Sequence, residues 1–169
     1  MMETRSRYEI VDTIAVGDFG TVYRGRDREL GREVAIKQIH QQFLHDERQL
    51  ARYWQEAQLL ASLQHPHILT IYDIVRSRGW LIVELMRGSL KQATQGEPID
   101  LDFLRVALAC ALSALHFLHG NGIIHGDVKP SNLLVDLLDR NFAPQFAIAS
   151  AVHRAEVSHG DGVDDFVTR

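Results

Sequence analysis

The first forty residues alternate between apolar and polar positions, and glycines interrupt the alternation. Alternation with a period of two is typical of strands that bury one face. The segments with this pattern are residues 8–14, 21–25 and 33–39. Turns containing Gly17 and Gly31 join them, so the pattern predicts an antiparallel meander.

The period changes to three or four residues over residues 46–63. Apolar side chains recur there with charged residues between them, at Leu50, Trp54, Ala57 and Ala61. This spacing predicts an amphipathic helix, and Pro66 marks its end because the residue before a proline is disfavoured in helical geometry. Two further strands are expected over residues 68–75 and 80–85, on either side of a turn at residues 77–79.

Residues 101–119 form the second predicted helix, and its apolar positions are the most regular in the chain. Asp100 is a candidate N-cap, and Gly120 and Gly122 end the pattern. The expected buried stripe consists of Leu104, Leu108, Ala111, Leu115 and Leu118. A strand at residues 133–135 follows, so the order is that of an α+β fold with the sheet first and a boundary near residues 86–91.

Composition narrows the classes of function. The chain has 169 residues, 46% hydrophobic and 24% charged, with a net charge of −4. That balance offers no basic surface for nucleic acid and argues against a membrane-surface role. The polar N-terminus is unlike a secretory signal, and the apolar run at residues 106–118 is too short to span a bilayer. With Cys110 as its single cysteine, expected to be a small buried hydrophobe, the protein is expected to be cytoplasmic.

Four elements carry candidate chemistry. They are the turn with Gly17 and Gly20, Lys37 on an apolar strand, Glu56 on the first helix, and the loop at residues 125–132. Glycines allow backbone N–H groups to approach phosphate oxygens, and a strand lysine can hold phosphates together with a carboxylate partner. In the loop, Asp127 could accept a proton, Lys129 could neutralise a phosphoryl group, and Asn132 could hold a metal ion. Each element also has an ordinary structural reading: a plain turn, a lysine reaching solvent, a solvated helix charge and a polar surface turn.

In this order and at these separations, the four elements resemble those of the protein kinase family. Lys129, two places after Asp127, resembles the serine/threonine group. The resemblance implies a two-lobed fold that binds ATP between its lobes and transfers the γ-phosphoryl group to a hydroxyl. It implies an N-lobe of antiparallel sheet plus one helix over residues 8–86, and an incomplete helical C-lobe over residues 87–169 that ends in the activation segment.

The resemblance also assigns nucleotide-binding residues. Val83 would be the gatekeeper, and the backbone of Glu84 and Met86 would bind adenine. The remaining residues around the nucleotide would come from the strands, the glycine turn and the first helix: Ile14, Ala15, Gly17, Gly20, Val22, Ala35, Lys37, Glu56 and Leu134. His65-Pro66-His67 resembles the segment after the regulatory helix. A metal site at this His pair, or at His116 and His119, is disfavoured because no Cys or carboxylate cluster is near in sequence.

The sequence departs from the family pattern at four places. Ala15 replaces a glycine of the phosphate-binding turn, and Gly126 replaces the arginine that precedes the catalytic aspartate. Gln145 stands where the family has the Asp that binds Mg²⁺, so weak or absent magnesium binding is expected. The chain ends near Thr168, which would contact Asp127 and Lys129, and the apolar helix at residues 101–119 would need a cover such as a partner, a second copy or further sequence.

Three hypotheses follow. The chain is a serine/threonine kinase that binds ATP and phosphorylates a protein hydroxyl, a pseudokinase that binds nucleotide or acts as a scaffold, or a fragment without independent function. Lys37, Glu56, Asp127, Lys129 and Asn132 favour the first hypothesis. Gln145 and Ala147 favour the second, in which catalysis is impaired or absent.

Overall fold

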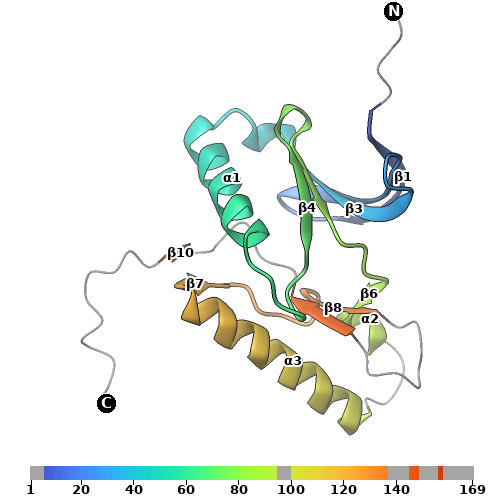
Figure 1. The fold of residues 1–169 in the computed structure, drawn as a ribbon, viewed down its shortest axis with the longest axis vertical. Helices are drawn as coiled ribbons and strands as arrows, with labels where there is room; N and C mark the ends of the chain where they lie inside the picture. Colours follow the sequence, from blue (N-terminus) through green and yellow to red (C-terminus); the bar gives the residue numbers. More distant parts are fainter. Residues whose placement is uncertain (1–5, 95–99, 137–144, 149–155, 158–169) are drawn as a thin grey trace, which may run out of the picture.

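A five-stranded antiparallel sheet dominates the N-terminal half of the computed structural model, which describes residues 6–94, 100–136, 145–148 and 156–157. The strands lie in the order β1-β2-β3-β5-β4 (Figure 1). Their bounds are Tyr8–Val16 for β1, Gly20–Asp27 for β2, Arg32–Ile39 for β3, Ile71–Val75 for β4 and Trp80–Val83 for β5. The predicted meander is therefore confirmed, and the fourth and fifth strands lie within the ranges expected for them.

Alternation along β3 divides the sheet into two packed faces. Val34 and Ile36 pack with Tyr8, Trp80 and Ile82 on one face. Ala35 and Ile39 belong to the main core on the other face, because successive residues of a strand point to opposite sides. The main core reaches from this second face through the first helix to the C-terminal half, so the two halves share one continuous core.

The helix α1, Glu47–Ala61, packs against the second face of the sheet. Asp46 caps it, and its carboxylate accepts hydrogen bonds from the backbone N–H groups of Arg48 and Gln49 at 3.1 and 3.0 Å. Its buried face consists of Tyr53, Trp54, Ala57 and Leu60. The expected contribution of Ala61 is wrong: this residue is exposed at the last turn, and Leu60 takes the buried position.

Short elements connect the sheet to the C-terminal half. One-turn 3-10 helices occupy Gln41–Phe43 (η1) and Arg76–Arg78 (η2). The strand β6, Gly88–Ser89, leads into α2, Leu90–Ala93. After the long helix come β7 at Ile123–Ile124, β8 at Leu133–Asp136, β9 at Gln145–Ile148 and β10 at Glu156–Val157. The predicted strand at residues 133–135 is thus confirmed as part of β8.

The long helix α3, Leu101–Gly120, begins at the predicted N-cap, since the Asp100 carboxylate accepts a hydrogen bond from the N–H of Asp102 at 3.0 Å. It lies at the bottom of Figure 1, below β7 and β8, and contacts β7 and β9. Its fully buried face consists of Ala107, Ala111, Ala114 and Leu118. The expected burial of Leu108 is wrong: its side chain is 49% exposed, because the small alanines make the close contacts with the core.

The outer face of α3 exposes several apolar side chains. Leu101, Leu108 and Leu112 are 73%, 49% and 65% exposed, and Val106 is also exposed. By length and composition alone, α3 is the one helix in the described ranges that could cross a membrane. Cys110, on the same helix, is partly buried and free, and burial raises the pKa of its thiol.

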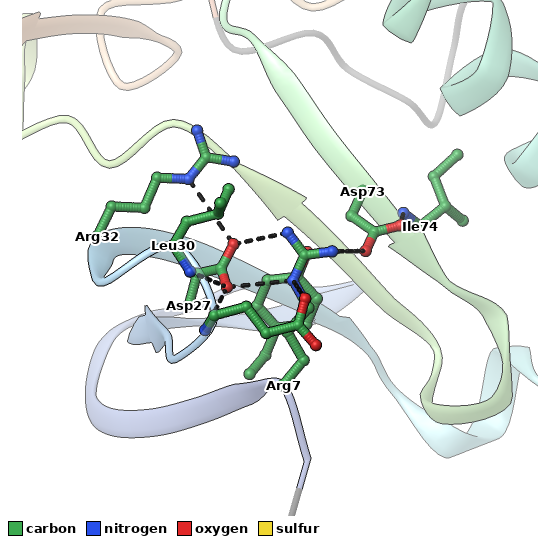
Figure 2. A network of polar contacts seen from close by, with 8 residues as sticks. Arg7, Asp27, Leu30, Arg32, Asp73 and Ile74 are labelled. Atoms are coloured by element: carbon green, nitrogen blue, oxygen red, sulfur yellow. Dashed lines mark hydrogen bonds and ion pairs between the residues drawn. The ribbon is translucent and has the colours of Figure 1, made fainter.

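A buried ion network holds the outer end of the sheet (Figure 2). The Asp27 carboxylate has no exposed side-chain surface and accepts two hydrogen bonds from the Arg7 guanidinium, at 2.8 and 3.1 Å. The N–H groups of Glu29 and Leu30 donate to the same carboxylate. Arg7 also lies 3.8 Å from Asp73, which ties the start of β1 to β4. The Arg7 hydrogen bond is the main cause that lowers the pKa of Asp27.

Candidate functional site

The turn between β1 and β2 is closed by a backbone hydrogen bond and packs tightly at one of its glycines. The N–H of Gly17 donates to the carbonyl of Gly20 at 2.9 Å, which closes the turn. A Cβ on Gly20 would overlap the carbonyl oxygen of Gln38 on the neighbouring strand, so only glycine fits there. Ala15 pairs with Val22 in the ladder, and the methyl group at this position is accommodated without breaking the hairpin.

Lys37 extends from β3 on the face that carries the main core. It lies between Ala35 and Ile39, both of which pack in that core, and its Cα pairs with that of Val22 next to the glycine turn. The side chain is half-buried. Burial lowers the pKa of its ammonium group, because the charged form loses hydration that protein atoms do not replace.

Glu56 lies on α1, the helix that covers this face. Its Oε2 atom is buried without a hydrogen-bond partner, and burial raises the pKa of Glu56 to about 7, against the opposing charge of Arg52. Within the described part of the chain, no ion pair or hydrogen bond joins Glu56 to Lys37. The pair expected from the sequence is not formed, and the charges that act on the Glu56 carboxyl come from its own helix.

Two of the residues expected near adenine, Ala35 and Val83, meet at the end of β5. Ala35 and Val83 are Cα partners across β3 and β5, and both are buried. Val22 and Leu134 are half-buried, whereas Ile14 is 45% exposed. The N–H of Glu84 donates to the carbonyl of Thr70 at 2.9 Å, which fixes the chain at the start of the segment to Met86.

The loop after β7 is tightly connected around Asp127. The Lys129 ammonium lies 2.8 Å from the Asp127 carboxylate, and the Asn132 amide donates to that carboxylate at 3.1 Å and to the Asp127 carbonyl at 2.8 Å. These contacts, with the Lys129 hydrogen bond first among them, lower the pKa of Asp127. The carboxylate therefore stays ionised near neutral pH and can accept a hydrogen bond from a hydroxyl group.

Two supports of this loop were not identified from the sequence. His125 is buried, and its Nδ1 accepts a hydrogen bond from the N–H of Asp127 at 3.3 Å. Gly126, between them, has φ of 70°, a backbone conformation that favours glycine. Glycine at position 126, where the family pattern has arginine, therefore suits this backbone conformation.

The helix α2 was also missed. Its signal was present: Ser89 and Gln92 form a capping box, with Ser89 Oγ accepting from the N–H of Gln92 and the Gln92 side chain accepting from the N–H of Ser89. The N–H of Lys91 in this helix donates to the carbonyl of Pro130 at 3.1 Å. α2 thus holds the loop that contains Lys129 and Asn132.

The two histidines after α1 connect it to α3. The His65 ring stacks on Phe117 with 4.9 Å between centroids, and its Nε2 lies 3.3 Å from Ser113 Oγ. The N–H of His67 donates to His65 Nδ1 at 3.1 Å. Among the described residues, no group of three or more His, Cys, Asp or Glu side chains could hold a metal ion.

The segment expected to supply a metal ligand forms β9, which pairs antiparallel with β8. Gln145 pairs with Asp136, whereas Ile148 pairs with Leu133, the residue after Asn132. Gln145 and Ile148 are three residues apart, which corresponds to about 10 Å along a strand. The sequence of β9, Gln-Phe-Ala-Ile, contains no carboxylate at any of its four positions. The predicted contacts of Thr168 lie outside the described residues.

The family model for the protein kinase domain matches residues 8–159 of the chain. That match spans both halves of the fold and includes every candidate residue described above except Thr168. The chain belongs to the protein kinase family.

Individual kinases agree with this assignment. The chain is 36% identical over 157 residues to the probable serine/threonine-protein kinase PknB of Lactococcus lactis subsp. lactis (strain IL1403), covering 90% of this chain and 25% of that kinase. It is 32% identical over 161 residues to the serine/threonine-protein kinase PrkC of Bacillus subtilis (strain 168), covering 93% and 25%. It is 32% identical over 141 residues to the human NUAK family SNF1-like kinase 1, covering 78% and 21%.

The chain therefore spans about a quarter or less of the length of these kinases. Its resemblance is to serine/threonine members of the family, from bacteria and from animals. The α+β fold with an antiparallel sheet and one helix in the N-lobe agrees with the expectation from the sequence.

Proposed function

We propose that this kinase-family chain binds ATP between the sheet and the loop at residues 125–132, and that its phosphotransfer activity is weak or absent. The observation that carries the proposal is the state of Lys37. Its ammonium group is half-buried, has a lowered pKa, and lacks the expected carboxylate partner within the described chain. A phosphate group would supply the missing negative charge.

The surroundings of Lys37 fit a nucleotide. The glycine turn lies one strand away, where Val22 pairs with Lys37, and offers backbone N–H groups to phosphate oxygens. Ala35 and Val83 provide an apolar wall suited to adenine. With the N–H of Glu84 already bonded to Thr70, the Glu84 carbonyl and the N–H of Met86 are the backbone groups we assign to the base.

The chain has some of the residues that phosphotransfer requires. Asp127 is an ionised acceptor for a substrate hydroxyl, and Lys129 beside it could stabilise a transferring phosphoryl group. The residues do not fit magnesium well, because Asn132 offers a neutral amide and β9 contains no carboxylate. Loss of charge stabilisation worth several kcal/mol would slow transfer by roughly a hundredfold or more. We therefore favour a pseudokinase of cytoplasmic location over an active kinase that phosphorylates protein Ser or Thr residues.

Thermal unfolding with increasing ATP, with and without Mg²⁺, tests the binding proposal. We expect stabilisation that rises with ATP concentration, reaching about 2.7 kcal/mol at a hundred times the dissociation constant, and that changes little with Mg²⁺. Lys37→Met should abolish the stabilisation by ATP. Arg26→Gln, at an exposed site on β2, is the matched control that should retain it. A wild-type protein that ATP leaves unchanged would rule out the proposal.

A phosphotransfer assay with γ-labelled ATP separates the two hypotheses. Transfer that requires Mg²⁺ and disappears in Asp127→Asn would establish an active kinase and refute the pseudokinase. ATP binding without transfer to itself or to a generic protein substrate supports the pseudokinase.

A further inference from the structure

The tip of the glycine turn contacts a ring outside the two strands that form it. The Phe19 ring lies against the Phe43 ring, with 5.2 Å between centroids and an angle of 43° between the planes. Phe19 belongs to the turn, whereas Phe43 is the last residue of η1, which follows β3 along the chain. Distances of this size are in the favourable range for aromatic pairs.

The Phe43 side of this contact is anchored. Phe43 is half-buried and packs against the main core together with Leu44. Its N–H donates to the carbonyl of His40 at 3.0 Å, and Leu44 contacts the backbone at Gly79, where an added Cβ would lie 3.3 Å from its Cδ2. The segment at residues 40–44 is therefore held by the core and by the loop before β5.

The Phe19 side is more exposed. The Phe19 side chain is 43% exposed, and Val16 at the start of the turn is 74% exposed. Two polar contacts also join this part of the chain to His40. The N–H of His40 donates to the Phe19 carbonyl at 3.0 Å, and Thr21 Oγ1 lies 3.2 Å from His40 Nε2. All three contacts join the turn to residues 40–43.

We propose that Phe43 is a positioning residue for the phosphates of the bound nucleotide: through Phe19 it holds the tip of the glycine turn in place above them. The inference rests on the proposed ATP site and adds a residue that touches neither base nor phosphate. The turn faces the phosphates, while adenine is assigned to β5 and the segment after it. Loss of the ring contact should therefore weaken binding of a nucleoside triphosphate far more than binding of the nucleoside.

Calorimetric titrations with ATP and with adenosine, both without Mg²⁺, test this selectivity. We expect Phe43→Ala to weaken ATP binding by roughly 3- to 10-fold, as expected for one aromatic pair, and adenosine binding by less than about 2-fold. Phe43→Tyr, which retains the ring, should bind both ligands like the wild type. Phe19→Ala should show the same selective loss, and adding it to Phe43→Ala should cost less than the sum of the two single changes, because both remove the contact between these rings.

Hydrogen exchange in the protein without nucleotide gives a second, independent measurement. Phe43→Ala should accelerate exchange of the Gly17 N–H, which closes the turn, while the α1 amides keep their rates. Equal loss of ATP and adenosine affinity, or unchanged exchange at Gly17, overturns the role of Phe43 and leaves the ATP site intact. Failure of the wild type to bind either ligand refutes the ATP site itself. If Phe43→Ala does not fold, the surface substitution Phe19→Ala decides by the same two criteria.

Discussion

The ammonium nitrogen of Lys129 lies 2.8 Å from Oδ2 of Asp127, on the same carboxylate that accepts from the Asn132 amide. This contact is the largest cause of the lowered pKa of Asp127. It keeps the carboxylate charged and oriented through contacts within the eight-residue loop.

Lys129→Met should raise the pKa of Asp127 towards its ordinary value, because the cation that stabilises the carboxylate is lost. Lys129→Arg should leave it lowered. A carbon-detected NMR titration of the Asp127 carboxyl, identified through Asp127→Asn, measures the shift. An Asp127 pKa that is the same in Lys129→Met and the wild type would contradict the assigned cause.

Glu56 predicts a pH dependence of stability. Its pKa is about 7 in the folded protein and 4.5 for an ordinary carboxyl, so the folded state holds a proton that the unfolded state releases. The contribution of Glu56 is therefore most favourable below pH 4.5 and is lost as the pH rises towards 7. The carboxyl is partly exposed, so we expect a loss on the order of 1 kcal/mol.

Urea unfolding of the wild type and Glu56→Gln between pH 5 and 8 measures this effect. The free energy of unfolding of the wild type, relative to Glu56→Gln, should fall with rising pH and level off above pH 7. A difference between the two proteins that is constant with pH would show that the carboxyl titrates normally.

The buried network around Asp27 predicts a large effect on stability far from the proposed ATP site. Asp27→Asn removes the charge that pairs with Arg7, and an NH₂ group replaces Oδ2, the oxygen that accepts from Arg7 Nη2. We expect the midpoint of thermal unfolding to fall by roughly 5–10 °C. Asp12→Asn, which disrupts an exposed ion pair with Arg24, should change it by less than about 2 °C. Similar shifts for the two variants would mean that burial does not strengthen the Asp27 network.

The elements that could be predicted from the sequence are those fixed by contacts close along the chain. The strands at residues 8–39 follow from alternation and glycine turns, and the N-cap Asp100 stands next to its helix. The loop around Asp127 is predictable for the same reason, because Lys129 and Asn132 reach it within five residues.

Contacts between distant segments were not predictable. Whether Glu56 reaches Lys37 depends on the placement of the whole of α1 on the sheet, and spacing along the chain contains no such information. Asp27 and Asp73 lie on β2 and β4, and Arg7 precedes β1, so these residues form one network only after the sheet is assembled. The position of Phe43 against Phe19 has the same origin, since β2 and β3 separate the two residues along the chain and bring them together only when they pair.

The exposed face of α3 predicts self-association through a second copy of the chain. Leu108 and Leu112 lie one turn apart on that face, and exposed apolar side chains in a row favour association in water. Sedimentation equilibrium should show a mass that rises with concentration. Leu108→Gln combined with Leu112→Gln should weaken association by at least about tenfold, whereas Arg105→Gln on the same helix should not. A wild type that stays monomeric would end this prediction.

The ladder between β8 and β9 decides where a carboxylate could restore magnesium binding. The family resemblance aligns Gln145 with the metal-binding Asp, yet the ladder brings Ile148 opposite Leu133, next to Asn132, and leaves Gln145 opposite Asp136. A metal ion shared with Asn132 needs ligands within about 2.0–2.1 Å, so a residue roughly 10 Å along the strand cannot contribute. We therefore expect Gln145→Asp to leave ATP binding nearly independent of Mg²⁺. Titrations of this variant with ATP, with and without Mg²⁺, measure the effect. A gain of ATP affinity in Mg²⁺ for Gln145→Asp would restore the alignment of the resemblance and contradict the argument from the ladder.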